Sequence, residues 1–342
     1  QEEKPLFYYI QNKQLIQLDT SSLDSFHEYR KDNAYLWLGN NGLDNYSLIF
    51  DAQKETSFQM SSLIGSFHKE KKAYNVLHPF TSATYVQGAR TEQYFNILHT
   101  QNFSKNGNFS LEYDKINAGG SYERQKANNN NIIASLNYTT PKGNYKTSFF
   151  AQRIKNTTEQ NGGIANDSLF IINSDLSLNR KTITVNLDSA YKQRIGNLLT
   201  LDQELLLING IDSTGLGHNQ KLLFNTSFTN AKRFYTDANP NSIYYPAINI
   251  DSTFTNDSIK TNQIEQEVAY QFNIHRRKSS YNILPYVRYQ YFDYRQANEH
   301  FYYNDMALGL KTNIKTVRTN FKTHFNYYWT GYRKQNYSWD TR

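Results

Sequence analysis

Apolar and polar side chains alternate along much of the chain. In the segment 317–329, the odd-numbered positions are Val, Thr or aromatic, and the even-numbered positions are Arg, Lys, His, Asn or Tyr. Successive side chains of a β-strand point to opposite faces, so this segment would have one apolar, aromatic face and one hydrophilic face. The same alternation recurs in the segments 109–114, 132–138, 201–207, 264–274 and 281–291.

The lengths of these segments distinguish between classes of β protein. A strand that crosses a membrane needs ~9–11 residues, whereas strands of soluble proteins average ~5–6 residues. Most of the strands in which we place these segments are about ten residues long or longer, which favours membrane-spanning strands. Alternation by itself does not say which face is wet. We predict eleven spanning strands, near 82–88, 92–102, 107–116, 131–140, 144–155, 197–208, 218–233, 262–275, 280–294, 301–313 and 317–332.

The connections between these strands alternate between short and long. Short polar turns at 104–107, 141–144 and 276–279 alternate with three long polar stretches. Outer-membrane barrels have short turns on the periplasmic side and long loops outside. Apolar and polar residues also alternate in the segment 181–192. If this segment were another spanning strand, the later short turns would lie outside and the later long loops on the periplasmic side, so we place it within a long outer connection.

The predicted fold class is therefore all-β, a transmembrane antiparallel up-and-down β-barrel. Residues 81–342 are assigned to the barrel, with long outer loops near 117–130, 156–196 and 234–261. Residues 1–80 are a periplasmic segment, a plug or the first strands. Bacterial single-chain barrels have even strand numbers. Eleven strands with no closing aromatic strand predict an incomplete, C-terminally truncated copy.

The composition agrees with a barrel and excludes several other classes. The chain has 342 residues, 28 Tyr, 21 Phe and a formal charge of +7, yet its mean hydropathy is −0.76. Its Lys and Arg residues are scattered, so a nucleic-acid partner is not expected. Because Cys is absent, disulfides, Cys-ligated zinc and thiol catalysis are excluded.

Five short motifs follow one another along the chain: FHEY at 26–29, LGNNG at 38–42, TEQYFNILHTQN at 91–102, GSYERQK at 120–126 and EQNGG at 159–163. In this order they resemble the porins of Bacteroidota that are classed together as a family of outer-membrane barrels. The resemblance is firmest over roughly residues 20–165. It implies an outer-membrane β-barrel that is usually longer than this chain, and it implies no catalytic residues.

Charged side chains on the hydrophilic face are the candidates for lining a pore. Opposed acidic and basic groups across a lumen would tune ion selectivity; an ordinary solvated or salt-bridged wall is the alternative. The pore-lining candidates are Glu265, Glu267, Arg288, Arg318 and Lys322.

Aromatic side chains on the apolar face are the candidates for a membrane girdle. Amphipathic rings gather at the boundary between membrane and water; packing in the core of a soluble protein is the alternative. The girdle candidates are Tyr138, Phe272, Tyr289, Tyr291, Tyr327 and Trp329.

The sequence offers no motif for catalysis. The eight His residues are dispersed without a ligand pair, and there is no G-x-S-x-G, P-loop or H-E-x-x-H sequence. We therefore expect no catalytic residue, no metal site and no cofactor, and the protein is not expected to be an enzyme.

The leading functional hypothesis is a porin-like channel of the bacterial outer membrane for passive diffusion of small hydrophilic solutes. Its partners would be outer-membrane lipid and those solutes, and the oligomeric state is open. One alternative is a non-conducting outer-membrane barrel that serves as a binding or assembly component. Another is a soluble, secreted β protein that binds glycans.

Overall fold

The structure is a computed structural model, and it describes most of the chain after residue 70. The described residues are 71–88, 91–166, 180–211, 217–241, 243–245, 251, 253–276, 278–297 and 299–341, with four short N-terminal strands. These strands are β1 (Phe7–Gln11), β2 (Gln14–Gln17), β3 (Tyr35–Trp37) and β4 (Asn45–Ser47). The prediction for 1–80 rests mostly on residues outside this part, as do the motifs at 26–29 and 38–42. Within the described residues, no helix is long and apolar enough to cross a membrane.

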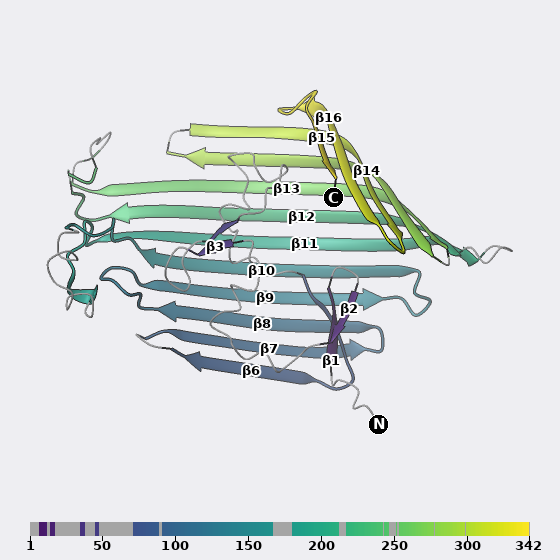
Figure 1. Cartoon of the computed structure of the whole chain (residues 1–342), viewed down its shortest axis with the longest axis horizontal. Coiled ribbons are helices and arrows are strands. Elements are labelled where there is room, and N and C mark those ends of the chain that lie inside the picture. Colours follow the sequence, from purple (N-terminus) through teal and green to yellow (C-terminus); the bar gives the residue numbers. More distant parts are fainter. Residues whose placement is uncertain are drawn as a thin grey trace.

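Twelve antiparallel strands form one sheet, and each pairs with the strands before and after it in the chain (Figure 1). The predicted all-β, up-and-down architecture is thus confirmed. The sheet is open, because its two edge strands, β6 and β17, do not pair with each other. The strands are β6 (Phe80–Gln87), β7 (Gln93–Ser104), β8 (Gly107–Ala118), β9 (Ala127–Thr139), β10 (Tyr145–Glu159), β11 (Ala190–Ile211), β12 (Gly217–Asp237), β13 (Thr255–Arg276), β14 (Ser279–Gln296), β15 (Glu299–Thr316), β16 (Asn320–Gly331) and β17 (Tyr337–Thr341).

The eleven predicted spanning strands correspond to β6–β16, and the sheet has a short twelfth strand, β17, that was not predicted. A tight turn follows β16, and Gly331 has a φ of 96° where it begins. An L side chain rarely adopts that conformation, so glycine suits the position. The returning strand pairs Trp339 with Phe325 and Tyr337 with Tyr327. With only five residues, β17 is too short to show the alternation that identified the others.

The six strands that flank the long connections, β8 to β13, all extend beyond their predicted limits toward those connections. β11 begins at Ala190 instead of near 197, and β13 begins at Thr255 instead of near 262. These extensions are polar, so they lack the apolar alternation, yet their backbones continue the ladder. The long connections are correspondingly 119–126, 160–189 and 238–254.

The segment 181–192 does not span the sheet. It starts in a one-turn 3₁₀ helix, η4 (Arg180–Thr182), and residue 185 forms a single bridge with Ile164. Ile183 and Leu187 are buried, so the alternating apolar residues pack the long connection together. Only from Ala190 does the chain join the sheet.

A small N-terminal sheet lies over one face of the large sheet (Figure 1). Its order is β2-β1-β5, with β5 at Ala73–Val76. β5 packs against β7, β8 and β9, and Tyr74 and Val76 form a buried cluster with Leu98. Asn102 donates to the carbonyl of Val76 at 2.6 Å. We call the face that carries β5 the inner face.

The two faces of the large sheet differ in polarity. Residues directly opposite on paired strands share a face. Phe228 pairs with Ile264 and Val268 pairs with Val287, and all four are exposed on the outer face. The inner face carries small, aromatic and charged side chains, including the buried Ala269. An exposed apolar outer face and a polar inner face agree with the predicted alternation.

Candidate pore lining

One row of directly opposite residues crosses four strands of the inner face. Asp202 on β11 lies opposite Asn225 on β12, which lies opposite Glu267 on β13 and then Arg288 on β14. Asn225 donates to Asp202. The alternation places these four side chains on the same face, and the register brings them level.

Glu267 is the centre of the largest charged cluster. Arg288 donates to its Oε2 at 2.7 Å, and Lys311 on β15 donates to its Oε1 at 2.8 Å. Glu265 lies 3.7 Å from Nε of Arg288. The side chains of Glu267 and Arg288 are only 13% and 11% exposed, so this pair is largely shielded from solvent. Two acids and two bases make the cluster electrically neutral.

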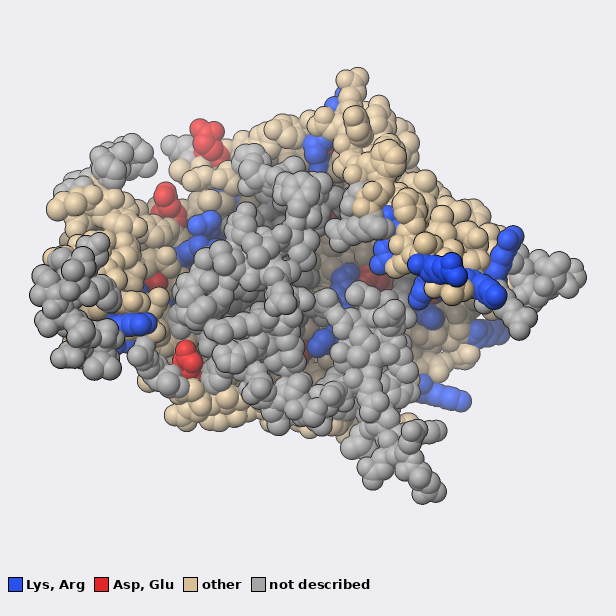
Figure 2. Space-filling model, in the orientation of Figure 1, with Lys and Arg blue, Asp and Glu red and all other residues tan. Residues whose placement is uncertain are grey.

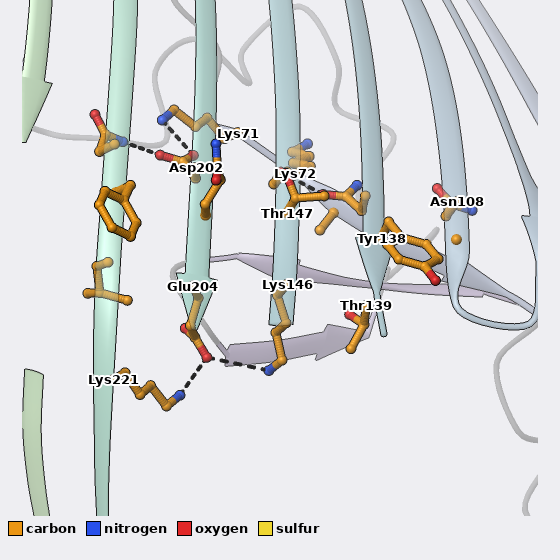
Figure 3. A pocket seen from close by; sticks show the side chains of 18 of the residues that line it. Lys71, Lys72, Asn108, Tyr138, Thr139, Lys146, Thr147, Asp202, Glu204 and Lys221 are labelled. Carbon is orange, nitrogen blue, oxygen red and sulfur yellow. Dashed lines mark hydrogen bonds and ion pairs between the residues drawn. The ribbon is translucent and has the colours of Figure 1, made fainter. Parts of the chain in front are cut away.

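A second cluster surrounds Glu204 on β11. Its Oε1 lies 2.7 Å from Lys221 on β12 and 3.9 Å from Lys146 on β10. Figure 3 shows Glu204 between these two cations. With one acid and two bases, this cluster keeps a positive charge.

Lys71 links the segment that leads into β5 to the sheet wall. Its Nζ lies 2.9 Å from Oδ2 of Asp202, and Figure 3 shows the two side chains facing each other. Together with the bond from Asn102 to Val76, this contact fixes β5 to the inner face at two points.

The turn after β16 folds back onto the inner face. Arg333 in this turn donates to Asp305 on β15 at 2.7 Å and also to Gln290. Its guanidinium lies 4.2 Å from the centre of the Tyr328 ring. A buried ion pair and a cation–π contact therefore hold the turn that leads into β17.

The clusters around Glu267 and Glu204, together with Lys71 and Asp202, border a cavity of about 1040 Å³ on the inner face. Seven basic side chains line it, namely Lys71, Lys72, Lys105, Lys146, Lys221, Arg288 and Lys311, against four acidic ones, Asp202, Glu204, Glu265 and Glu267. The lining thus has an excess of three positive charges. Figure 2 shows further Lys and Arg side chains gathered at the end of the molecule where the short turns lie, at the right.

The structure brings three of the five predicted pore-lining residues together. Glu265, Glu267 and Arg288 lie in one cluster beside the cavity. Lys322 lies on β16 opposite Asn313, exposed and outside the cavity lining. Arg318 lies in the exposed turn between β15 and β16, because β16 begins only at Asn320.

Sequence reasoning missed several charged residues of the cavity. Asp202 and Glu204 were visible as the polar positions of an alternating segment, and their strand could have indicated them. Lys311 and Lys221 lie on strands with weaker alternation. Lys71 precedes the large sheet, and only the fold brings it to the wall.

The predicted girdle residues all lie on strands of the large sheet, and most are on the outer face. Tyr289 and Tyr291 are partly exposed, and Phe272, Tyr327 and Trp329 are exposed. The ring of Phe272 lies 4.5 Å from that of Tyr270. Tyr138 lies near the end of β9, among the residues that border the cavity.

Two long connections meet at Asp237, the last residue of β12. Ser189 donates to its Oδ1 at 2.5 Å, and Tyr245 donates to its Oδ2 at 2.8 Å. Burial, and then the hydrogen bonds to Tyr235 and Asp237, raise the pKa of Tyr245. Tyr245 therefore remains a neutral donor well into the alkaline range, and it holds the connection after β12 to the strand end.

A family model described as "Putative porin" matches residues 6–341. Among curated proteins, no significant match was found. Two similar solved structures are the ferric citrate transporter FecA in its unliganded form (10% identity, TM-score 0.50) and the ferric-catecholate import receptor Fiu of E. coli K12 (9% identity, TM-score 0.51). Each match covers 76% of this chain but only 39% of FecA and 42% of Fiu. The chain thus spans about two fifths of the structures it matches, and the similarity shows the fold alone.

Proposed function

The chain belongs to the family described as "Putative porin", and with this premise we propose that it forms a water-filled channel for the passive diffusion of small hydrophilic solutes across the bacterial outer membrane. The family match and the fold of the sheet support the porin-like barrel architecture. The observation that supports diffusion is the charged cavity on the inner face, opposite an outer face of exposed apolar residues.

The inner wall suits a hydrated solute because its polar groups are already organised. Asp202, Glu204, Glu267 and Arg288 exchange hydrogen bonds with neighbours on adjacent strands, so their positions do not depend on a bound ligand. A solute that loses part of its hydration shell finds donors and acceptors along this wall. No catalytic step and no energy coupling are part of the proposal.

The charge of the lining adds a preference for anions. Its excess of three positive charges attracts anions, since fields are focused in a cleft with low-dielectric walls. Because Glu265, Glu267, Arg288 and Lys311 neutralise one another, the excess arises from the lysines nearer the short turns.

The test is conductance of the native, detergent-purified protein in planar bilayers. We expect stepwise conductance in KCl and a reversal potential, under a KCl gradient, of the sign that indicates chloride preference. Bilayers that contain folded protein but never conduct would contradict the proposal.

A second candidate is a non-conducting barrel that binds a partner, and one observation favours it. β5 lies against the inner face, held by Lys71 and Asn102. If this segment blocks the lumen, the native protein would not conduct ions, and conductance would be seen only after the contact of Lys71 with Asp202 is removed. The same bilayer experiment therefore separates the two candidates.

A further inference from the structure

The outer face carries a row of basic residues on neighbouring strands. Lys155 on β10 lies opposite Ile195 on β11, which lies opposite Lys232 on β12. Lys232 lies opposite Lys260 on β13, and Lys260 lies opposite Arg295 on β14. The three lysines and Arg295 are exposed. Figure 1 shows these five strands side by side. We call Lys155, Lys232, Lys260 and Arg295 the basic row.

A ladder of hydrogen bonds lies beside the basic row, two residues nearer the short turns. It runs from Arg153 through Asn197, Asn230 and Asn262 to Asp293, one residue on each strand from β10 to β14. Asn230 donates to Asn262 at 2.6 Å, and Asn262 donates to Asp293 at 2.9 Å. Polar side chains that form hydrogen bonds with the side chains of neighbouring strands do not need water as a partner, so they are expected where little water is present.

The next row toward the short turns is largely apolar. It contains Leu199, Phe228 and Ile264, all exposed on the outer face. Apolar residues, then an amide ladder, then cations follow one another in steps of ~6.6 Å along the strands. This order is expected where a barrel surface passes from hydrocarbon into lipid headgroups. The basic row therefore lies at the edge of the apolar surface, on the side of the long connections.

Among the described residues, only Arg295 of the basic row has an anionic partner, Asp293, whose Oδ2 lies 3.3 Å from Nε of Arg295. In the part of the chain that the structure describes, none of the three lysines of the row forms an ion pair. Lys232 and Lys260 lie directly opposite each other, so their positive charges repel each other. Like charges directly opposite each other destabilise a sheet. Asp293, the acid in the neighbouring row, is buried and bonded to Asn262, His300 and Arg295.

We propose that the basic row binds the phosphate groups of anionic lipids in the outer leaflet. This rests on the proposed location in the outer membrane, but not on conduction. Adjacent strands are ~4.8 Å apart, so one phosphate can contact Lys232 and Lys260 together. Strand tilt of ~35–45° gives neighbouring cations depths that differ by about 3 Å, which flexible lysine side chains can span. The position beside exposed apolar residues selects a lipid phosphate over a free anion.

The test compares the variant K232Q/K260Q with the matched control K142Q/K278Q. Lys142 and Lys278 are exposed in short turns at the other end of the strands, so the control loses the same charge. Native mass spectrometry of the detergent-purified protein would count bound molecules of a glycolipid that carries two phosphates, and of the same glycolipid with its phosphates removed. We expect K232Q/K260Q to bind the phosphorylated lipid roughly tenfold more weakly. The control and the wild type should bind it equally.

Thermal unfolding supplies a second readout that is independent of mass spectrometry. The phosphorylated lipid should raise the unfolding temperature of the wild type and leave that of K232Q/K260Q unchanged. In neutral detergent without this lipid, K232Q/K260Q should be at least as stable as the wild type, because repulsion is removed. The single variant K260Q repeats the test if the double variant does not fold.

Three results would overturn the proposal. They are unchanged lipid binding by K232Q/K260Q, equal loss in K142Q/K278Q, and equal stabilisation by inorganic phosphate without lipid. Conductance separates this proposal from the channel proposal. K232Q/K260Q should conduct like the wild type, whereas failure of the channel proposal would leave lipid binding intact.

Discussion

Arg288 donates two hydrogen bonds to one oxygen of Glu267, from Nε at 3.1 Å and from Nη2 at 2.7 Å. The two residues lie directly opposite each other on β14 and β13. Lys311 occupies the other carboxylate oxygen of Glu267. Each oxygen of this shielded carboxylate thus has a cationic donor, and removal of either partner leaves a charge that water can only partly solvate.

The first prediction concerns the stability that this pair provides. Arg288→Met should destabilise the fold by about 3 kcal/mol, because it leaves Glu267 without its main partner in a site that is nearly closed to solvent. Lys311 should prevent a larger loss. The measurement is the urea concentration at which the folded, fast-migrating form disappears on a gel. The double variant R288M/E267Q should recover part of the loss, and equal loss in both variants would mean that packing, not charge, is responsible.

The second prediction concerns selectivity at the Glu204 cluster. Glu204→Gln removes the single acid between Lys146 and Lys221, so the lining would have an excess of four positive charges instead of three. The chloride-to-potassium permeability ratio should rise by roughly twofold to fivefold, since one unpaired charge near water is worth ~1 kcal/mol. Reversal potentials in KCl gradients measure this ratio.

Two controls make that selectivity test specific. Lys221→Gln should shift the ratio in the opposite direction. Glu299→Gln removes an acid outside the cavity lining and should leave the ratio unchanged. A ratio that stays constant in both Glu204→Gln and Lys221→Gln would mean that solutes do not pass this cluster.

The third prediction concerns the link between β5 and the wall. Lys71→Ala and Asp202→Asn each remove the contact at 2.9 Å and should increase conductance fluctuations. Both side chains are about one third exposed, so stability should change by less than ~1 kcal/mol. Single-channel recordings measure the fluctuations, and high salt should reproduce them in the wild type by screening the pair.

The absence of Cys provides a direct control for this link. In the variant K71C/D202C, a short bifunctional thiol reagent should crosslink the two positions and reduce the conductance fluctuations to the level of the wild type. If joined and free channels fluctuate equally, β5 does not control the lumen.

Local pattern predicted the sheet far better than the charged cavity. Strict alternation located β13, β14 and β16, because a run of apolar residues at every second position there lies on the outer face, as Val268, Val287 and Phe325 do. The contacts of Glu267 depend on register across three strands, and register comes from strand pairing and turn geometry, which no single strand encodes. Lys311 and Lys71 were therefore missed. Arg318 was misplaced because the alternation continues through the turn that ends before Asn320.

The basic row shows the same limit. Lys155, Lys232, Lys260 and Arg295 lie far apart in sequence, and each is an ordinary polar residue beyond an apolar segment. Only the register aligns them. Because these strand extensions have no apolar alternation, the sequence placed some of their residues in loops.

The fourth prediction identifies the face that contacts lipid. Val268→Arg places a cation on the outer face, where Val268 is 44% exposed and lies opposite Val287. An Arg near the middle of a bilayer costs ~2–4 kcal/mol. The variant should therefore fold with much lower yield into lipid vesicles, while in micelles, whose surface deforms around the charge, the loss should be smaller. Heat-modifiable migration on a gel measures the folded fraction.

Ser227→Arg is the matched control for that substitution. Ser227 lies on the inner face of the adjacent strand, directly opposite Glu265, so the new cation would meet an acid and water. This variant should fold into vesicles like the wild type and should increase chloride preference in bilayers. Equal folding of both variants would mean that neither face contacts hydrocarbon, as in a soluble sheet. Poor folding of Ser227→Arg alone would mean that the inner face contacts lipid and the outer face contacts water.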